Sequence, residues 1–297
     1  GQPDPASKSE TELAIKRLND NYPFVGILED WELSVCLLHA MYGGECHSWE
    51  LGTSNTAGNS TTSVNELEGF TDVADGRLYA AGQRHFKANL ERYAVSMPSC
   101  SCSPKVGVNR EASEQAKDSQ RALLTKRHDP KPIAFLHVPK CAGNQFPWSF
   151  LTLPGVCSNL SETDWQVIFR PNSSELGHGY GINDYLKDHL SSPVEDVCSG
   201  VADTRRWGVE FASHTGINSV YSQFYAGLQA HGFIMLRQPE QRLLSGYYFL
   251  SAQEAPKDYA AANAGCTVKL LTRSGAACQD PAQPSDHEVS LAVQRLQ

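Results

Sequence analysis

Several absences limit what this chain can be. It has no run of 18 apolar residues among its 297, which excludes a membrane-spanning helix within it. It has no C-x-x-C pair, so a zinc site is not expected. Its formal net charge is −8, so it lacks the overall basic surface with which proteins bind nucleic acid. It also lacks GxxxxGK[ST], the signature of a Walker A loop.

Cysteine, in contrast, is plentiful. Nine cysteines are many for a protein of a reducing compartment, and the short spacing of Cys266 and Cys278 makes them the first candidates for a disulfide. Cys157 and Cys198 are the second candidates. Three sequons for N-glycosylation begin at Asn59, Asn159 and Asn172. Together these features predict an oxidising, secretory environment.

The most informative stretch is residues 133–150. Residues 133–138 form an apolar run typical of a buried strand, which stops at Pro139. A short segment of small and polar residues with Lys140 follows, and bulky residues then restart as a helix would. A strand, a tight loop with a lysine and a helix N-terminus together can bind a phosphate. A strand followed by an ordinary surface turn is the alternative.

A second stretch, residues 232–250, has the same design. The apolar residues 233–236 predict a strand that ends in the polar turn Arg237-Gln238-Pro239. An amphipathic helix follows, in which Ser245 lies about two turns after Arg237. An arginine and a hydroxyl in this arrangement can bind a second phosphate.

The two stretches together resemble the nucleotide-binding elements of sulfotransferases that use 3′-phosphoadenylyl sulfate (PAPS). HVPKCAGNQF, residues 137–146, looks like their 5′-phosphosulfate loop, and LRQPEQRLLSGYYF, residues 236–249, looks like their 3′-phosphate element, R-D-P-x-x-R-x-x-S. The resemblance is closest to the carbohydrate sulfotransferases of the Golgi, the heparan 2-O type among them. Two positions depart from the family pattern: Gln238 replaces an aspartate, and Cys141-Ala142 replaces a pair such as Thr-Gly.

The resemblance implies an α/β fold, with a mostly parallel sheet flanked by helices and a phosphate-binding loop (a P-loop-like sulfotransferase fold). It implies an enzyme that transfers the sulfuryl group of PAPS to a hydroxyl of a carbohydrate, without a metal. Lys140 is expected to stabilise the leaving group. The PAPS-binding residues that it implies are Lys140, Cys141, Ala142, Gly143, Asn144, Gln145, Arg237 and Ser245.

A sugar hydroxyl needs a base, and histidine is the natural candidate. His214 lies just upstream of the second strand, where the 2-O enzymes have an H-G-H motif whose second histidine is the base; Ala212 stands in place of the first. His178, flanked by glycines, is the rival candidate, and Glu210 is a third. His137 lies within the predicted strand and is expected to be structural.

The order of the family elements is rotated along this chain. Residues 24–29, FVGILE, look like a turn that follows the PAPS motifs in the family, yet here they precede them. Residues 288–297 also repeat the pattern of residues 10–19, although two short amphipathic helices can match by chance. We therefore expect a segment of a tandem array or a natural circular permutant. The expected parts are a linker (1–10), the C-terminal part of a sulfotransferase unit (11–95), a flexible linker (96–130) and the PAPS-binding and catalytic part (131–297), together one domain.

Hydrophobic patterns also predict helices over residues 11–19, 28–42 and 75–93, with Thr11 as the cap of the first. In the helix after residue 239, Tyr247, Tyr248 and Phe249 are expected to pack in the core rather than stack on a ligand. Lys269 and Arg273 lie where relatives close over the nucleotide or meet an anionic glycan.

The expected partner is a carbohydrate acceptor, a glycan or polysaccharide, with possible neighbouring sulfotransferase units. The expected location is the Golgi lumen or the secretory pathway, with any membrane anchor outside this chain. Another class of function stays open: a catalytically inactive unit that binds a glycan or a nucleotide. A phosphate-loop kinase is a further alternative, disfavoured by the missing GK[ST] and by the lack of an obvious magnesium-binding aspartate after a strand.

Overall fold

A computed structural model describes the parts of the chain that build its sheet and most of its core. The described residues are 6–44, 46, 48–51, 63–97, 100, 133–136, 138, 140–142, 153, 210–212, 231–250 and 252–272. In chain order the elements are α1 (Lys8–Asn21), β1 (Phe24–Ile27), η1 (Leu28–Asp30), α2 (Trp31–Tyr42), η2 (Ser48–Leu51), η3 (Val64–Leu67), α3 (Val73–Arg92), β2 (Ile133–Leu136), β3 (Glu210–Ala212), β4 (His231–Leu236), α11 (Pro239–Leu250), α12 (Pro256–Asn263) and α13 (Cys266–Thr272).

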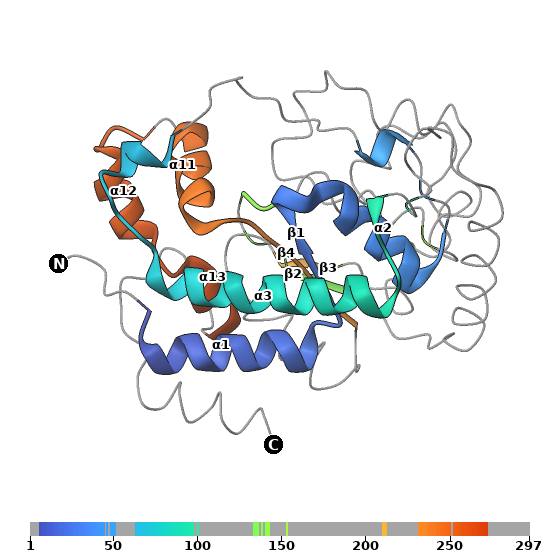
Figure 1. Cartoon of the computed structure of the whole chain (residues 1–297). Coiled ribbons are helices and arrows are strands. Elements are labelled where there is room, and N and C mark those ends of the chain that lie inside the picture. The colour runs from blue at the N-terminus through green and yellow to red at the C-terminus, as the bar shows by residue number, and fades with distance from the viewer. Residues whose placement is uncertain are drawn as a thin grey trace.

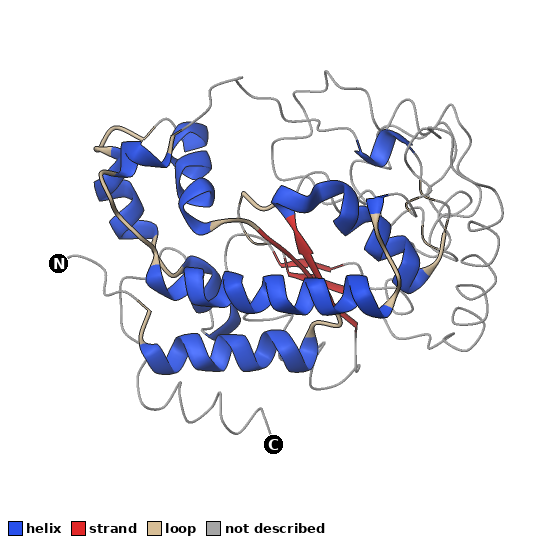
Figure 2. Ribbon diagram, viewed as in Figure 1, coloured by secondary structure: helices blue, strands red, loops and turns tan. Residues whose placement is uncertain are grey.

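The four strands form one sheet in the order β1-β4-β2-β3, and every neighbouring pair is parallel. Phe24 is paired with Phe233, and Ile133 with His231, so strands far apart in sequence lie in register. The expected α/β fold with a parallel sheet is therefore present (Figures 1 and 2). β1 comes from the segment 11–95 and the other strands from 131–297, so described residues of both segments share this sheet.

Helices cover both faces of the sheet. On one face the rings of Phe24 and Phe233 stack 5.3 Å apart, and Tyr42 at the end of α2 lies 4.7 Å from Phe233. On the other face α3 approaches so closely that a Cβ atom on Gly82 would lie 2.3 Å from a methyl group of Leu236. Because side chains alternate along a strand, these contacts place α2 and α3 on opposite faces. α1 and α13 pack beside α3 in the same outer layer (Figure 1).

The first helix starts earlier than its pattern predicted. Ser7 caps α1 by accepting a hydrogen bond from the Glu10 backbone, and the Glu10 carboxylate accepts one from the Ser7 backbone in return. This capping box satisfies two backbone donors of the first turn. The prediction of Thr11 as the cap is wrong, since Thr11 lies inside the helix, and residues 8–10 belong to α1 rather than to a linker.

The other helices largely agree with their patterns. The helix expected over residues 75–93 is α3, Val73–Arg92, and the one expected over 28–42 begins as the 3₁₀ turn η1 and continues as α2. None of the helices in the described part of the chain is long and apolar enough to cross a membrane. The repeat at residues 288–297 lies outside the described residues.

One disulfide joins the core to a segment that we expected to be a linker. Cys36 of α2 is bonded to Cys100, and both are buried. The expectation of a flexible linker is therefore wrong at Cys100. Cys266 is also disulfide-bonded. The other cysteines of the two expected pairs, Cys278, Cys157 and Cys198, lie outside the described residues.

Candidate anion-binding site at the ends of strands β2 and β4

Two cationic side chains that the sequence placed in separate motifs meet in the structure. Lys140 follows the end of β2, and Arg237 is the first residue after β4. Because β2 and β4 are parallel neighbours, both residues leave the sheet at its carboxyl edge, where open α/β sheets bind ligands. A guanidinium N–H of Arg237 donates a hydrogen bond of 3.3 Å to the backbone carbonyl of Lys140, which is 97 residues away in sequence.

The turn that carries Lys140 has an unusual backbone. Lys140 has a φ of 66° and Ala142 a φ of 58°, both in the left-handed region that residues with a Cβ atom rarely adopt. Between them, Cys141 donates its backbone N–H to the Val138 carbonyl at 3.1 Å, and its side chain is buried. Turns with left-handed residues can direct successive N–H groups toward one point and so bind anions. Gly143, Asn144 and Gln145 lie outside the described residues.

Charge in this turn is unbalanced. Burial and the nearby guanidinium of Arg237 both lower the pKa of Lys140. Among the described residues, no carboxylate lies within 4.0 Å of the Lys140 ammonium or the Arg237 guanidinium. Burial also raises the pKa of the Cys141 thiol to about 12, so the thiol carries no charge. An anion placed here would relieve the repulsion between the two cations.

Gln238, which stands where the sulfotransferase pattern has an aspartate, caps helix α11. The side-chain carbonyl of Gln238 accepts a hydrogen bond of 2.9 Å from the backbone N–H of Gln241, in the first turn of α11. This is the contact that an N-cap residue makes, and an aspartate could make it equally well. Gln238 therefore fixes the geometry of the turn that carries Arg237.

Glu29, in the turn η1 that follows the neighbouring strand β1, contacts the same turn, and we did not predict it as a site residue. One of its carboxylate oxygens accepts a hydrogen bond of 3.0 Å from the Gln238 backbone N–H. The other accepts one of 2.9 Å from the Tyr79 hydroxyl of α3, and burial followed by the charge of Glu29 raises the pKa of Tyr79. The sequence did point to this region, because Glu29 is the last residue of FVGILE, the stretch that resembles a turn of the sulfotransferases.

Helix α11 carries two further residues of the second motif. Arg242 is buried and lies 3.5 Å from a carboxylate oxygen of Asp75 and 3.8 Å from one of Asp72, while it donates a hydrogen bond to the Asn263 carbonyl. It is thus a structural residue. Ser245 is half-buried, and no hydrogen-bond partner for its hydroxyl exists in the described part of the chain.

The last turn of α11 differs from the expectation of core packing. Tyr248 and Phe249 are 48% and 58% exposed. The Lys140 ammonium lies 3.6 Å from the centre of the Phe249 ring, whereas the Tyr248 hydroxyl donates a hydrogen bond to Glu66. The expectation for Lys269 is also wrong. Lys269 is a residue of α13 and is only 1% exposed, so it cannot meet a glycan at the surface.

The histidine candidates cannot be placed. His214 and His178 both lie outside the described residues, as does Arg273. β3 ends at Ala212, is parallel to β2 and therefore reaches the same carboxyl edge of the sheet. Glu210 is the first residue of β3, at the opposite end of that strand.

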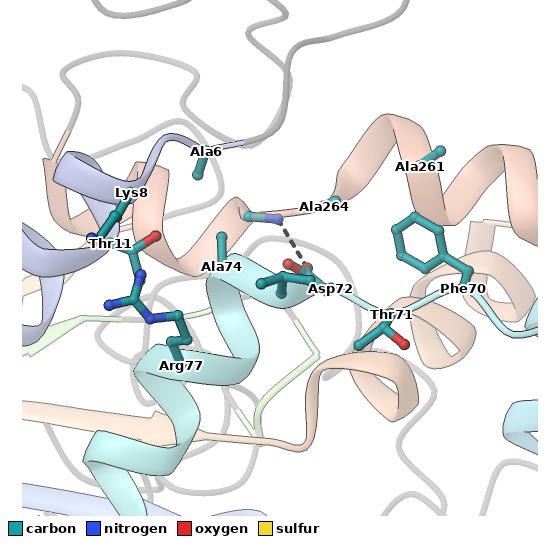
Figure 3. A pocket seen from close by; sticks show the side chains of 12 residues that line it. Ala6, Lys8, Thr11, Phe70, Thr71, Asp72, Ala74, Arg77, Ala261 and Ala264 are labelled. Atoms are coloured by element: carbon teal, nitrogen blue, oxygen red, sulfur yellow. Dashed lines mark hydrogen bonds between the residues drawn. The ribbon is translucent and has the colours of Figure 1, made fainter.

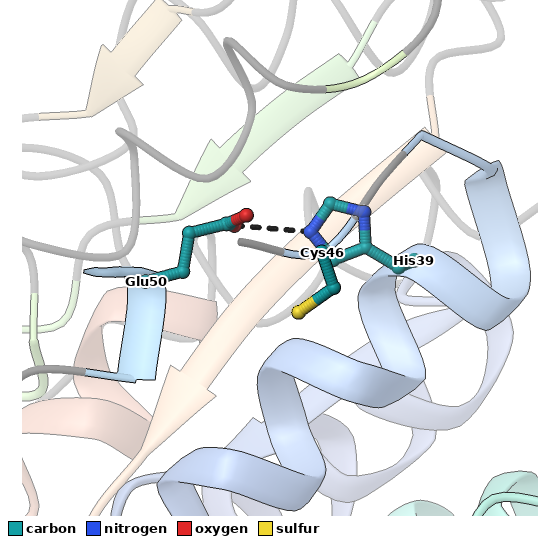
Figure 4. Close-up of side chains that lie close together, drawn as sticks. All are labelled: His39, Cys46 and Glu50. Carbon is teal, nitrogen blue, oxygen red and sulfur yellow. Dashed lines mark hydrogen bonds and ion pairs between the residues drawn. The ribbon is translucent and has the colours of Figure 1, made fainter. Parts of the chain in front are cut away.

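A buried cluster elsewhere contains three residue types that can bind a metal, but one of them cannot do so here. A ring nitrogen of His39 lies 3.0 Å from a Glu50 carboxylate oxygen, and the Cys46 sulfur is within 4.8 Å of both groups (Figure 4). Cys46 is disulfide-bonded, so it has no thiolate to offer a metal. The histidine and the carboxylate instead satisfy each other as a buried hydrogen-bonded pair.

A pocket of about 580 Å³ opens on another side of the molecule, between the starts of α1 and α3 and the end of α12 (Figure 3). Four of its twelve lining residues are alanines, Phe70 and Asp72 lie on its wall, and Lys8 and Arg77 lie at one side. None of Lys140, Arg237 and Ser245 lines it. The pocket is therefore separate from the candidate anion site.

Comparisons with known proteins give no relative for this chain: no family model, no curated protein and no solved structure matches it.

Proposed function

We propose that this protein is a PAPS-dependent sulfotransferase that acts on a hydroxyl of a carbohydrate and has the P-loop-like sulfotransferase fold. The observation that carries the proposal is the meeting of Lys140 and Arg237. The two motifs were identified separately, from residues about a hundred positions apart, and each would bind one phosphate of PAPS. Their cationic residues lie side by side at the carboxyl edge of a parallel sheet, joined by the Arg237–Lys140 hydrogen bond.

The roles follow from the chemistry of sulfuryl transfer. The acceptor oxygen attacks sulfur, the bond between sulfur and the 5′-phosphate oxygen breaks, and adenosine 3′,5′-bisphosphate leaves. Lys140 would stabilise the charge on the leaving phosphate and on the sulfuryl oxygens. Cys141 and Ala142, with Gly143, Asn144 and Gln145, would contribute backbone N–H groups around the 5′-phosphate. Arg237 and Ser245 would bind the 3′-phosphate.

The acceptor proton would pass to a histidine, with His214 as the first candidate and His178 as the second. A base keeps the acceptor oxygen nucleophilic while the sulfuryl group moves, and no metal takes part in the step as proposed. The sequence favours a glycan or polysaccharide acceptor in the Golgi lumen or secretory pathway. Any membrane anchor or neighbouring sulfotransferase unit would lie outside this chain.

The first test is binding of adenosine 3′,5′-bisphosphate, measured by calorimetry or as a thermal shift. The substitutions Lys140→Ala and Arg237→Ala should each weaken binding at least about tenfold, because hydrogen bonds to charged groups contribute roughly 1.5–3 kcal/mol. Matched controls are Lys87→Ala and Arg84→Ala, two exposed residues of α3, which should leave binding unchanged. Failure of the folded protein to bind the bisphosphate would refute the proposed nucleotide site.

Transfer is then tested with labelled PAPS and a panel of glycans. His214→Ala should abolish transfer while nucleotide binding persists, and an equal loss in His178→Ala alone would move the base to that residue. Tight binding without transfer to any acceptor would favour the alternative of an inactive nucleotide- or glycan-binding unit. Binding of ATP in preference to the bisphosphate would favour the kinase alternative.

A further inference from the structure

The ammonium of Lys140 is held by an aromatic ring rather than by an acid. Its nitrogen lies 3.6 Å from the centre of the Phe249 ring, and in the described part of the chain no carboxylate is within ion-pair distance of it. Phe249 is not a core residue, since 58% of its surface is exposed, and its neighbour Leu250 is 64% exposed. The ring is therefore at the surface, with the lysine as its close contact.

The choice of a ring has a physical consequence. The negative face of an aromatic ring attracts an ammonium group, and at an exposed site this attraction is weak. A carboxylate in the same place would bind the lysine more strongly and would also repel an incoming phosphate. A ring holds the charged lysine in the site but offers no such repulsion, so a phosphate can displace it.

We propose that Phe249 competes with the nucleotide for Lys140: its ring holds the ammonium in the free protein, and the leaving-group phosphate takes the ammonium over on binding. The inference rests on the proposed function for the identity of the ligand. If the contact exists only in the free protein, it lowers the affinity for the nucleotide. Such a contact would also help the bisphosphate product to leave, because Lys140 has the ring to return to.

The decisive measurement is the dissociation constant of adenosine 3′,5′-bisphosphate in the full chain with Phe249→Leu. Leucine keeps an apolar side chain but has no ring to attract the ammonium. We expect binding to become roughly two- to fivefold tighter, which is the ratio that corresponds to about 0.5–1 kcal/mol for an exposed cation–π contact. Phe249→Trp keeps a ring that attracts the ammonium, so the variant should bind the bisphosphate as weakly as the wild type or more weakly. Leu250→Ala is the matched control for an exposed apolar neighbour.

A double-mutant cycle separates the contact from other effects of the substitution. In a Lys140→Met background, Phe249→Leu should leave the dissociation constant unchanged, because no ammonium remains for the ring to hold. An unchanged or weaker affinity in Phe249→Leu, or the same gain in the Lys140→Met background, would overturn the proposal.

A second readout needs no nucleotide. The rate at which an amine reagent labels Lys140, followed by mass spectrometry across the alkaline range, gives the pH midpoint of its ammonium. Phe249→Leu should lower that midpoint by roughly 0.4–0.7 units. A change in the limiting rate without a shift in midpoint would mean that the ring only shields the lysine, and would refute the contact. If the midpoint shifts but the bisphosphate does not bind, the proposed function has failed and the competition with it, while the lysine–ring contact remains.

Discussion

Asp72 should make this protein less stable as the pH rises through neutrality. One oxygen of its carboxyl group caps α3 by accepting a hydrogen bond of 3.1 Å from the Asp75 backbone N–H. The other oxygen accepts one of 2.9 Å from the Gly265 backbone N–H (Figure 3). Asp75 in turn accepts hydrogen bonds from the backbone N–H groups of Thr267 and Val268. The two carboxyl groups thus join the start of α3 to the start of α13.

Among the described residues, a single cationic side chain, that of Arg242, lies beside both carboxyl groups. Asp72, Asp75 and Arg242 are 2%, 2% and 5% exposed, so the charge of the second carboxylate is poorly screened. Burial, and next the charge of Asp75, raise the pKa of Asp72 from 3.8 to about 7, although Arg242 and the two backbone N–H groups act in the opposite direction. In the folded protein Asp72 therefore keeps its proton to near-neutral pH.

The sign of the effect follows from proton linkage. The unfolded chain loses the Asp72 proton near pH 3.8 and the folded protein near pH 7, so between these values the folded state binds more protons. This contribution to stability is complete below pH 3.8 and is lost as the pH rises through 7. From pH 5 to pH 8 the loss is about 2.7 kcal/mol, two pH units at about 1.36 kcal/mol each.

The assay is urea unfolding of the wild type and Asp72→Asn at several pH values between 5 and 8, at constant ionic strength. Asparagine also caps a helix but does not ionise, so the free energy of unfolding of the wild type relative to the variant should fall by about 2.7 kcal/mol across the range. Asp258→Asn, at an exposed position of α12, should show no such trend. A difference between wild type and Asp72→Asn that stays constant, or that grows with pH, would refute the reasoning.

Two further predictions concern the backbone and the disulfide. Ala142→Gly should raise the free energy of unfolding by about 0.5–1 kcal/mol, because relief of left-handed strain exceeds the added entropy of the unfolded chain; destabilisation in denaturant unfolding would contradict it. Replacing both Cys36 and Cys100 with alanine should cost about 4 kcal/mol, the loop-closure entropy of a cross-link across 64 residues. Thermal unfolding of the variant and of the oxidised wild type checks this, and a loss below about 1 kcal/mol would show that the loop is ordered without the bond.

Much of the local structure could be predicted from the sequence. The apolar runs before Pro139 and before Arg237 are strands, and the segment after Gln238 is a helix, because hydrophobic periodicity and proline act over a few neighbouring residues. The same local patterns misplaced the start of α1. Ser7 and Glu10 form the capping box, and this S-x-x-E pattern stands in the sequence before the first apolar residues, so the start of α1 was predictable and was missed.

The candidate site was predicted as two separate motifs, and the sequence could not show how they meet. Nothing in the motif of Lys140 requires contact with Arg237; parallel pairing of β2 and β4 places them together. Glu29 was identified only as part of a turn, and its contact with Gln238 needs β1 to lie beside β4. Contacts between distant residues depend on the order of strands in the sheet.

Local patterns in the sequence were enough to predict strands β2 and β4, most of helices α1, α2, α3 and α11, and the two stretches in which a cationic residue follows a strand. The burial of Lys269, the exposure of Phe249 beside Lys140 and the bond between Cys100 and Cys36 follow from tertiary packing, and the sequence patterns did not predict them. The physical reason is that propensity and periodicity are properties of neighbouring residues. Burial, charge balance and disulfide pairing are properties of the surroundings, which segments far apart in sequence create when they pack on one sheet.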